Sequence, residues 1–495
     1  MTKNGNFYKI DTEADGVWWP SRSSKPLFAQ FAWAGSIPAS SVILYRMNKF
    51  AQIPQLEKLL SEKNLVELAA KIGRANILPV ADEYLQNIRT QLKAGTLDSV
   101  PSLESCATAV EKACAPIIRS LITNVVNASG VILHTNLGRS PLPKGVWSEA
   151  EKIASEYSSI EFDLTGGKRG SRFAFLTHSL SQLLGTEASL IVNNNAAAVF
   201  LLLKALAEGG EVIVSRGQQV QIGGGFRIPE ILKAAGCTLV EVGTTNITTL
   251  DDIRNAINEN TKMVLAVHSS NYRIRGFTQF PALRDIKKTL PEHIIFAVDQ
   301  GSGNIDVHID EEVTVREIIK SGADLVCFSG DKIFGGPQAG WISGKKALVD
   351  KIARHQLMRT YRVGRAVASL MQACLVRYLN GEKSVAAHAL NQDPENIKAR
   401  CEKIAAQLAG KKNLDITVVE AGFSLGGGST PDISFPTYAL KLIGKKSPDR
   451  IKNHLRDLAR PIIVIVENDT VLLHLVSVSE ADDAYLVQAL QETDF

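Results

Sequence analysis

Three features are scarce in this chain, and each scarcity excludes a class of protein. The six cysteines are scattered among 495 residues without a CxxC pair or a zinc-type spacing, so we expect free thiols and no metal site. No apolar run approaches the roughly 18 residues of a membrane span, and the extreme N-terminus lacks the order of a signal peptide. These absences predict a cytoplasmic protein with no membrane partner.

An excess of one charge is also missing. The formal net charge is only +4 at pH 7, whereas a nucleic-acid partner normally meets a stronger and more clustered positive surface. Charge alone therefore leaves such a partner open. With 45% hydrophobic and 21% charged residues, the chain has the composition of a globular protein that buries a large core in about two to four domains.

The first 120 residues divide into two parts. Residues 1–46 hold three of the five tryptophans and lack a sustained periodicity, which predicts a poorly ordered tail or a stretch upstream of the natural start at Met47. Between 47 and 120, apolar residues recur at spacings of three and four, which predicts a small helical domain. Its nine Lys and Arg nearly cancel its eight Asp and Glu, so composition favours a unit that packs or binds a partner.

From 121 onward, apolar strand patterns alternate with helical ones. This alternation predicts an α/β fold with a mostly parallel sheet, helices on both faces and ligands at the carboxyl ends of the strands. We expect a large catalytic domain over 121–375 and a small C-terminal α+β domain over 376–495. The predicted strands are 189–193, 211–215, 238–242, 262–268, 294–299 and 324–328, and 196–207 is predicted as a helix.

The most informative stretch is 328–340 (FSGDKIFGGPQAG), which places Lys332 after an apolar strand within a glycine-rich turn. A lysine is usually a solvated surface residue, so this one needs an independent partner. Asp299 supplies one, because it ends the preceding predicted strand. A lysine amine that forms a Schiff base and an aspartate that keeps a pyridine nitrogen protonated are what pyridoxal phosphate requires.

Other polar residues at strand ends suit the same cofactor. Asn194, Asn195 and Ala196 open a predicted helix whose free amides favour a phosphate, although a plain helix cap explains the asparagines equally. Ser329 either adds a hydroxyl to that phosphate or caps a turn. His268 either contacts the cofactor ring or is simply hydrogen-bonded at its strand end.

Arginines supply candidates for an anionic substrate. Arg139 lies in 137–142 (LGRSPL), and Arg359 and Arg362 lie in 358–362 (MRTYR). Guanidinium groups bind anions through two parallel hydrogen bonds, but single arginines are usually surface residues.

Several blocks of this sequence occur in the order of one known family. They are 127–139 (NASGVILHTNLGR), 192–198 (VNNNAAA), 215–217 (SRG), 222–224 (IGG), 226–229 (FRIP), 242–246 (VGTTN), 270–272 (SNY) and 328–340. Together they resemble bacterial selenocysteine synthase, L-seryl-tRNA(Sec) selenium transferase, from about Ile53 to the C-terminus. The resemblance implies an aminotransferase-like (fold type I) pyridoxal-phosphate enzyme, a tRNA-binding role for 47–120, and a homo-oligomer that is a ring of dimers (a decamer).

The resemblance also implies a reaction. Seryl-tRNA(Sec) displaces Lys332 from the cofactor, and the freed lysine removes the α-proton while Asp299 stabilises the carbanion through the ring. Loss of the β-hydroxyl gives an aminoacrylyl-tRNA, to which selenium from selenophosphate adds. Arg139, Arg359 and Arg362 match arginines that the family uses around the substrate anion, here selenophosphate.

Departures from the family pattern keep a second hypothesis open. Gln221, Ile247 and Gly364 stand where the family usually has glutamate, arginine and aspartate. The alternative is a related pyridoxal-phosphate lyase acting on a small amino acid or amino sugar phosphate, although relatives of that kind lack the N-terminal helical domain. A cofactor-free RNA-binding scaffold is a third interpretation, which the pairing of Lys332 with Asp299 disfavours.

Overall fold

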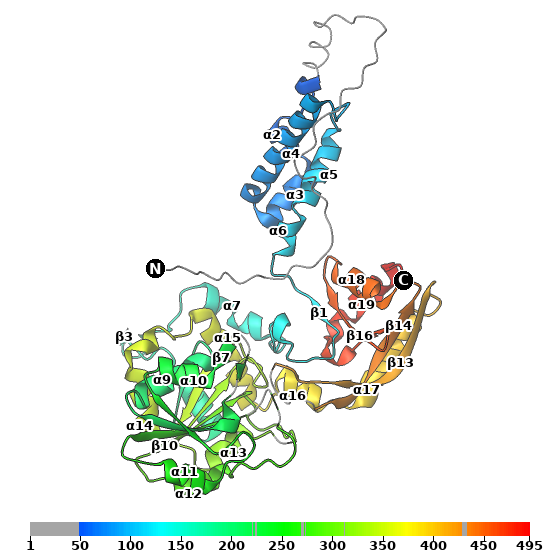
Figure 1. The fold of residues 1–495 in the computed structure, drawn as a ribbon. Coiled ribbons are helices and arrows are strands. Elements are labelled where there is room, and N and C mark those ends of the chain that lie inside the picture. The colour runs from blue at the N-terminus through cyan, green and yellow to red at the C-terminus, as the bar shows by residue number, and fades with distance from the viewer. Residues whose placement is uncertain are drawn as a thin grey trace, which may run out of the picture. The chain divides into compact units, whose positions relative to one another are not determined.

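The computed structural model describes residues 49–219, 221–222, 225–268, 272, 274–310, 312–427 and 433–495 (Figure 1). The predicted extension, residues 1–46, lies outside these ranges. The chain forms two compact units, one that ends at Ile122 and one that runs from Thr123 to Phe495. No helix in the described ranges is long and apolar enough to cross a membrane.

The first unit is helical, as the spacing of its apolar residues predicts. Its helices bury a core of their own, in which Leu59, Ile77, Leu85 and Val110 are at most 1% exposed. Gly73 ends one helix and begins the next with a φ of +80°, a conformation that favours glycine. The helices are α2 (Leu56–Leu60), α3 (Lys63–Ile72), α4 (Arg74–Ala94), α5 (Leu103–Ala113) and α6 (Ala115–Arg119).

A seven-stranded sheet organises the second unit. Its neighbouring strands run parallel except β12, which is antiparallel to both β11 and β4. The six predicted strands agree with the observed ones to within about two residues, but β12 was missed. In spatial order the strands are β4 (Ala188–Val192), β12 (Gly340–Gly344), β11 (Leu325–Ser329), β10 (Ile295–Gly301), β9 (Thr261–Val267), β5 (Glu211–Ser215) and β8 (Thr238–Val242).

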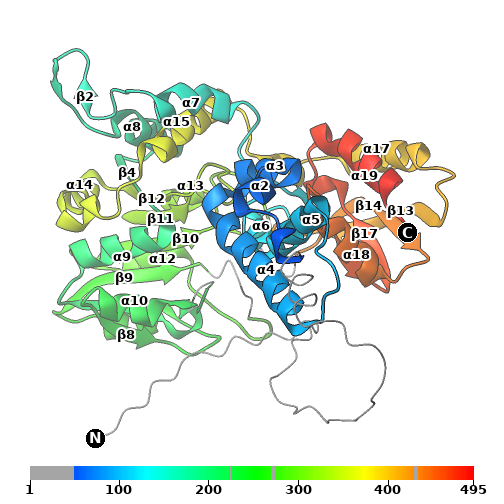
Figure 2. The same ribbon diagram turned by 90° about the horizontal axis from the view of Figure 1, so that it is seen from above.

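Helices cover both faces of this sheet (Figure 2). Leu201, Leu232 and Val349 bring α9 (Asn195–Leu206), α10 (Ile228–Ala234) and α14 (Lys346–Arg354) onto one face. The opposite face buries residues of five helices. These are α8 (Ala174–Leu184), α11 (Leu250–Ala256), α12 (Leu283–Thr289), α13 (Val315–Lys320) and α15 (Arg365–Leu379), the last of which also packs on α7 (Val146–Ser155).

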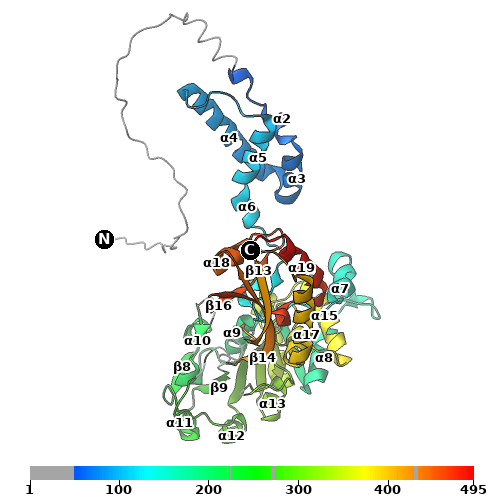
Figure 3. The same ribbon diagram turned by 90° about the vertical axis from the view of Figure 1, so that its right-hand side faces the viewer.

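A smaller antiparallel sheet follows near the C-terminus (Figure 3). Its spatial order is β13 (Leu414–Phe423), β14 (Phe435–Gly444), β17 (Thr470–Leu473) and β16 (Ile465–Glu467). Leu133 from the start of the second unit is buried in the same core. The elements around it are α16 (Val385–Leu390), α17 (Pro394–Gln407), α18 (Pro448–Arg456), α19 (Asp483–Glu492) and the parallel pair β1 (Val126–Asn127) and β15 (Ile462–Ile463).

These two sheets and the helical first unit confirm the predicted fold class, an α/β chain with a mostly parallel sheet and a C-terminal α+β part. The exact domain limits at 120 and 375 stay a prediction. Two short hairpins complete the described strands, β2 (Phe162–Asp163) with β3 (Lys168–Arg169) and β6 (Gln221–Ile222) with β7 (Phe226–Arg227). All six cysteines are free and buried.

Candidate active site

Asp299 and Lys332 come from adjacent parallel strands. Asp299 lies in β10 opposite Cys327 of β11, and Lys332 follows the end of β11 by three residues. The Asp299 carboxylate is close enough to raise the pKa of the Lys332 amine. The topology therefore brings together two residues that are 33 positions apart in the sequence.

The Asp299 carboxyl is buried, with 7% of the residue exposed. Burial raises its pKa, and a hydrogen bond from Asn195 and the charges of Lys332 and His268 oppose that shift. Asn195 Nδ2 donates to Asp299 Oδ1 at 2.8 Å, while the buried Asn195 Oδ1 has no hydrogen-bond partner among the residues that the structure describes. A cationic ring nitrogen beside Asp299 would favour the charged carboxylate.

Lys332 is half-buried within the glycine-rich turn. Burial lowers the pKa of its amine and the charge of Arg139 lowers it further, against the opposing effects of Asp299, Asp331 and Glu312. A lowered pKa increases the neutral, nucleophilic fraction of the amine at a given pH. The site thus favours the form of lysine that reacts with a carbonyl.

The three residues predicted to cradle a phosphate lie at the start of α9. Asn194 is the N-cap, and its Oδ1 accepts from the Ala197 amide at 2.8 Å. The cap interpretation of Asn194 therefore holds, and it leaves the amides of the first turn, including that of Ala196, pointing out of the helix. A Cβ on Gly340 would lie 2.1 Å from the Asn194 carbonyl oxygen, so β12 approaches this loop too closely for any side chain.

Arg139 reaches the turn that carries Lys332. Its Nη1 lies 2.8 Å from Asp331 Oδ2, and the Ser140 amide donates to the Asp331 carbonyl at 3.2 Å. Arg139 has a φ of +65°, which is uncommon for a residue with a side chain. The loop is therefore held in a strained shape that places a guanidinium close to Lys332.

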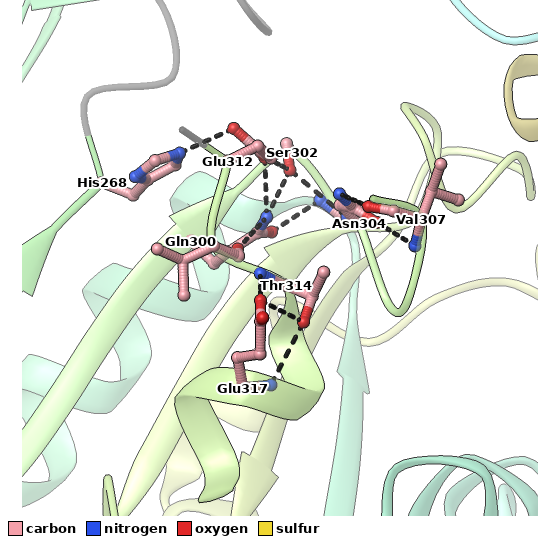
Figure 4. Close-up of polar contacts among 10 residues, drawn as sticks. His268, Gln300, Ser302, Asn304, Val307, Glu312, Thr314 and Glu317 are labelled. Atoms are coloured by element: carbon pink, nitrogen blue, oxygen red, sulfur yellow. Dashed lines mark hydrogen bonds and ion pairs between the residues drawn. The ribbon is translucent and has the colours of Figure 1, made fainter. Parts of the chain in front are cut away.

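His268 follows β9 directly and is anchored twice. Its backbone amide donates to the Asp299 carbonyl at 2.9 Å, and its Nε2 lies 2.7 Å from Glu312 Oε2. Figure 4 shows Glu312 also in contact with Gln300 and Ser302. Sequence reasoning missed Glu312, because it sits in a loop before α13 with no motif around it.

Arg359 and Arg362 lie in and just after a short helix that follows α14. Arg359 ends a short 3₁₀ helix, Gln356–Arg359, and is exposed. Arg362 Nη1 lies 3.6 Å from Glu161 Oε1. Among the described residues, no hydrogen bond or ion pair joins either arginine to Lys332, although the Tyr361 carbonyl between them accepts from the Asn193 amide at 2.9 Å. Their segment therefore borders the loop before α9.

Two further arginines share Glu161 with Arg362. Arg169 Nη2 lies 3.1 Å from Glu161 Oε2, and Arg172 pairs with Glu161 Oε1. Burial and the charge of Arg362 lower the pKa of Arg172, and the buried Arg172 Nε has no hydrogen-bond partner in the described part of the chain. We call these three side chains the arginine group.

Comparisons of the sequence with known proteins give matches over most of the chain. Residues 125–479 match the family model SelA, L-seryl-tRNA selenium transferase. The L-seryl-tRNA(Sec) selenium transferase of Nautilia profundicola is 38% identical over 453 residues, which cover 90% of this chain and 98% of that protein. The chain belongs to this family. The enzyme of the same name from Carboxydothermus hydrogenoformans is 37% identical over 89% of this chain and 97% of its own length.

Family membership confirms the predicted enzyme class, a selenium transferase, and favours it over the lyase alternative. Among solved structures, D-glucosaminate-6-phosphate ammonia-lyase matches 75% of this chain and 95% of its own, with a TM-score of 0.54. Its sequence is only 20% identical, so the likeness concerns the fold alone. The fold therefore does not separate the two activities, whereas the sequence does.

Proposed function

We propose that this chain converts L-seryl-tRNA(Sec) to L-selenocysteinyl-tRNA(Sec) with selenophosphate as the selenium donor and pyridoxal phosphate as the cofactor. The observation that carries the proposal is the placement of Lys332 and the buried Asp299 on adjacent parallel strands, inside the segment that matches the family. Two expectations accompany it, cytoplasmic activity and assembly as a ring of dimers.

The residues present fit pyridoxal phosphate. Lys332 would hold it covalently, Asp299 would face its ring nitrogen, and the first amides of α9 with Ser329 would face its phosphate. Within the described part of the chain, the buried Asn195 Oδ1 beside Asp299 has no hydrogen-bond partner, which supports a further polar group at this place. When bound, the cofactor supplies an electron sink for charge that develops at the substrate α-carbon.

Lys332 has the second task of moving a proton. When it is not bonded to the cofactor, the Lys332 amine would accept the α-proton of the seryl group, a role that its lowered pKa favours. Asn195 holds the Asp299 carboxylate in place, and a cationic ring nitrogen facing that carboxylate would favour its charged form. The β-hydroxyl would leave as water, and the selenium of selenophosphate would add at the β-carbon, with the P–Se bond cleaved by water and phosphate released.

Arg139, Arg359 and Arg362 are proposed to bind selenophosphate. Of these, Arg362 belongs to the arginine group, whose three guanidinium cations surround one carboxylate and leave a positive excess suited to an anion. Arg139 is already close to Lys332. The helical first unit is proposed to bind the tRNA, by shape and specific contacts because its charges nearly cancel.

Two activity assays on one preparation of the protein test the proposal. The purified full chain with pyridoxal phosphate should convert seryl-tRNA(Sec) and selenophosphate to selenocysteinyl-tRNA(Sec), measured by incorporation of radioactive selenium into acid-precipitable tRNA. The same preparation should release no ammonia from D-glucosaminate 6-phosphate. Efficient release of ammonia without selenium transfer would favour the lyase and contradict the proposal.

A further inference from the structure

One buried carboxylate near the cofactor site has no part in the chemistry above. Glu312 lies in the loop between β10 and α13, and only 3% of its side chain is exposed. A buried carboxylate is costly unless hydrogen bonds satisfy it. Gln300 and Ser302 contact one oxygen of Glu312, and His268 contacts the other.

Gln300 supplies the first donor. The Gln300 Oε1 accepts from the Gly303 amide at 2.8 Å, which fixes the other end of the side-chain amide as the donor Nε2. Nε2 then donates to Glu312 Oε1 at 3.0 Å. Gln300 is fully buried, so its amide has little freedom to turn away from Glu312.

Ser302 supplies the second donor (Figure 4). Its Oγ accepts from Gln300 Nε2 and from the Asn304 amide, the latter at 3.3 Å. A hydroxyl has a single proton to give, and the remaining partner of Oγ is Glu312 Oε1. Both donors therefore converge on Oε1 and leave Oε2 for His268.

Two contacts therefore fix His268, one through its imidazole ring and one through its backbone. Its Nε2 lies 2.7 Å from Glu312 Oε2, a contact in which the carboxylate accepts and Nε2 carries the proton. Its backbone amide donates to the Asp299 carbonyl at 2.9 Å. The backbone of His268 is thus tied to Asp299 of β10, and its ring is tied to Glu312.

We propose that Glu312 is a positioning residue for the selenium-transfer reaction, which holds the His268 imidazole in one orientation, with its proton on Nε2, against the cofactor ring. This inference rests on the proposed function. Gln300 and Ser302 act with Glu312 by keeping Oε2 turned toward His268. With the cofactor bound, an imidazole fixed in this way would limit the tilt of the cofactor ring while protons move at the substrate.

A double-mutant cycle on the full-length holoenzyme tests the coupling. Glu312→Gln should lower kcat by about 10- to 100-fold, as loss of a supporting hydrogen bond does at other sites, and should alter the visible circular dichroism of bound pyridoxal phosphate without substrate. Adding Glu312→Gln to His268→Asn should cost less than about twofold beyond His268→Asn alone, because Glu312 acts through His268. Losses that multiply fully would overturn the inference.

Glu317→Gln is the matched control. Glu317 is five residues away and caps α13, where its Oε2 accepts from the Thr314 amide at 2.8 Å and hydroxyl at 2.7 Å. This variant should lose thermal stability but keep kcat and the dichroism of the cofactor. Equal spectral changes in Glu317→Gln and Glu312→Gln would show a merely structural effect and overturn the positioning role.

Two further measurements test the inference, one on Ser302→Ala and one on cofactor binding by the wild-type protein. If Glu312→Gln does not fold, Ser302→Ala removes one donor to Glu312 and should shift the same dichroism band by a smaller amount; an unchanged band would count against the inference. Wild-type protein that binds no pyridoxal phosphate would overturn both this inference and the proposed function. If the wild-type protein binds pyridoxal phosphate but the losses of Glu312→Gln and His268→Asn multiply fully, only the inference would be overturned.

Discussion

Two groups of charged side chains in the second unit differ in how firmly they are held. Asp299 of β10, His268 after β9 and Glu312 in the loop after β10 are mostly buried, and each has a fixed hydrogen-bond partner. In the arginine group, Arg169, Arg172 and Arg362 share one partly exposed carboxylate, that of Glu161. The first arrangement suits chemistry that needs fixed geometry, and the second suits an anion that comes and goes.

Removing the lysine at the strand ends should have the largest effect. Lys332→Ala should lower selenium transfer by at least about 10⁴-fold, because covalent attachment and proton transfer disappear together. Borohydride should fix pyridoxal phosphate onto Lys332 in the wild type, located by peptide mass spectrometry. Lys346→Ala is the control, since Lys346 is exposed and pairs with Asp350. Recovery of the label on another lysine would refute the assignment.

Neutralising the buried aspartate should have the next largest effect. Asp299→Asn should keep some cofactor but lower kcat by about 10²- to 10³-fold, because a neutral amide does not hold the proton on the ring nitrogen. Cofactor content by absorbance and turnover under saturating seryl-tRNA(Sec) measure the two effects separately. Turnover close to that of the wild type would mean that another group protonates the ring.

Deleting the first unit extends the comparison to a region that contains neither group. A chain beginning at Thr123 should still bind pyridoxal phosphate but bind seryl-tRNA(Sec) at least about a hundred-fold more weakly, a loss of about 2.7 kcal/mol. Filter binding over a salt series measures this, and the slope should be modest because the unit is nearly neutral. A chain beginning at Met47 is the control and should keep full activity. Undiminished tRNA affinity without the first unit would favour the lyase.

The smallest effects should come from the arginines. Arg362→Ala or Arg359→Ala should raise the KM for selenophosphate by about 10- to 100-fold, as expected for one charged hydrogen-bond donor. Removal of the seryl α-proton, followed by tritium release, should change far less. Arg354→Ala is the control, because Arg354 is exposed and bonds to its own helix. Equal losses in both steps would show that Arg359 and Arg362 do not act on selenophosphate alone.

Sequence patterns located the strand ends well, because continuous apolar runs of about five residues between turn signals identify buried parallel strands. The prediction of 211–215 and of 238–242 coincides with β5 and β8. β12 was missed, since its residues Gly340–Gly344 follow a glycine-rich turn and their antiparallel pairing with β4 and β11 depends on strands far away in the chain.

The sequence by itself determined the class of chemistry. Lys332 after one apolar strand and Asp299 at the end of another are local signals, and parallel strands carry both side chains to the same edge of the sheet. The tertiary structure alone decided which neighbours support them. Asn195 contacts Asp299, which is 104 positions away in the sequence, and Arg139 contacts Asp331, which is 192 positions away. Glu312 contacts His268 only because the loop that carries it folds back toward the end of β9. Such contacts depend on how separate elements pack, and no spacing along the chain encodes that packing.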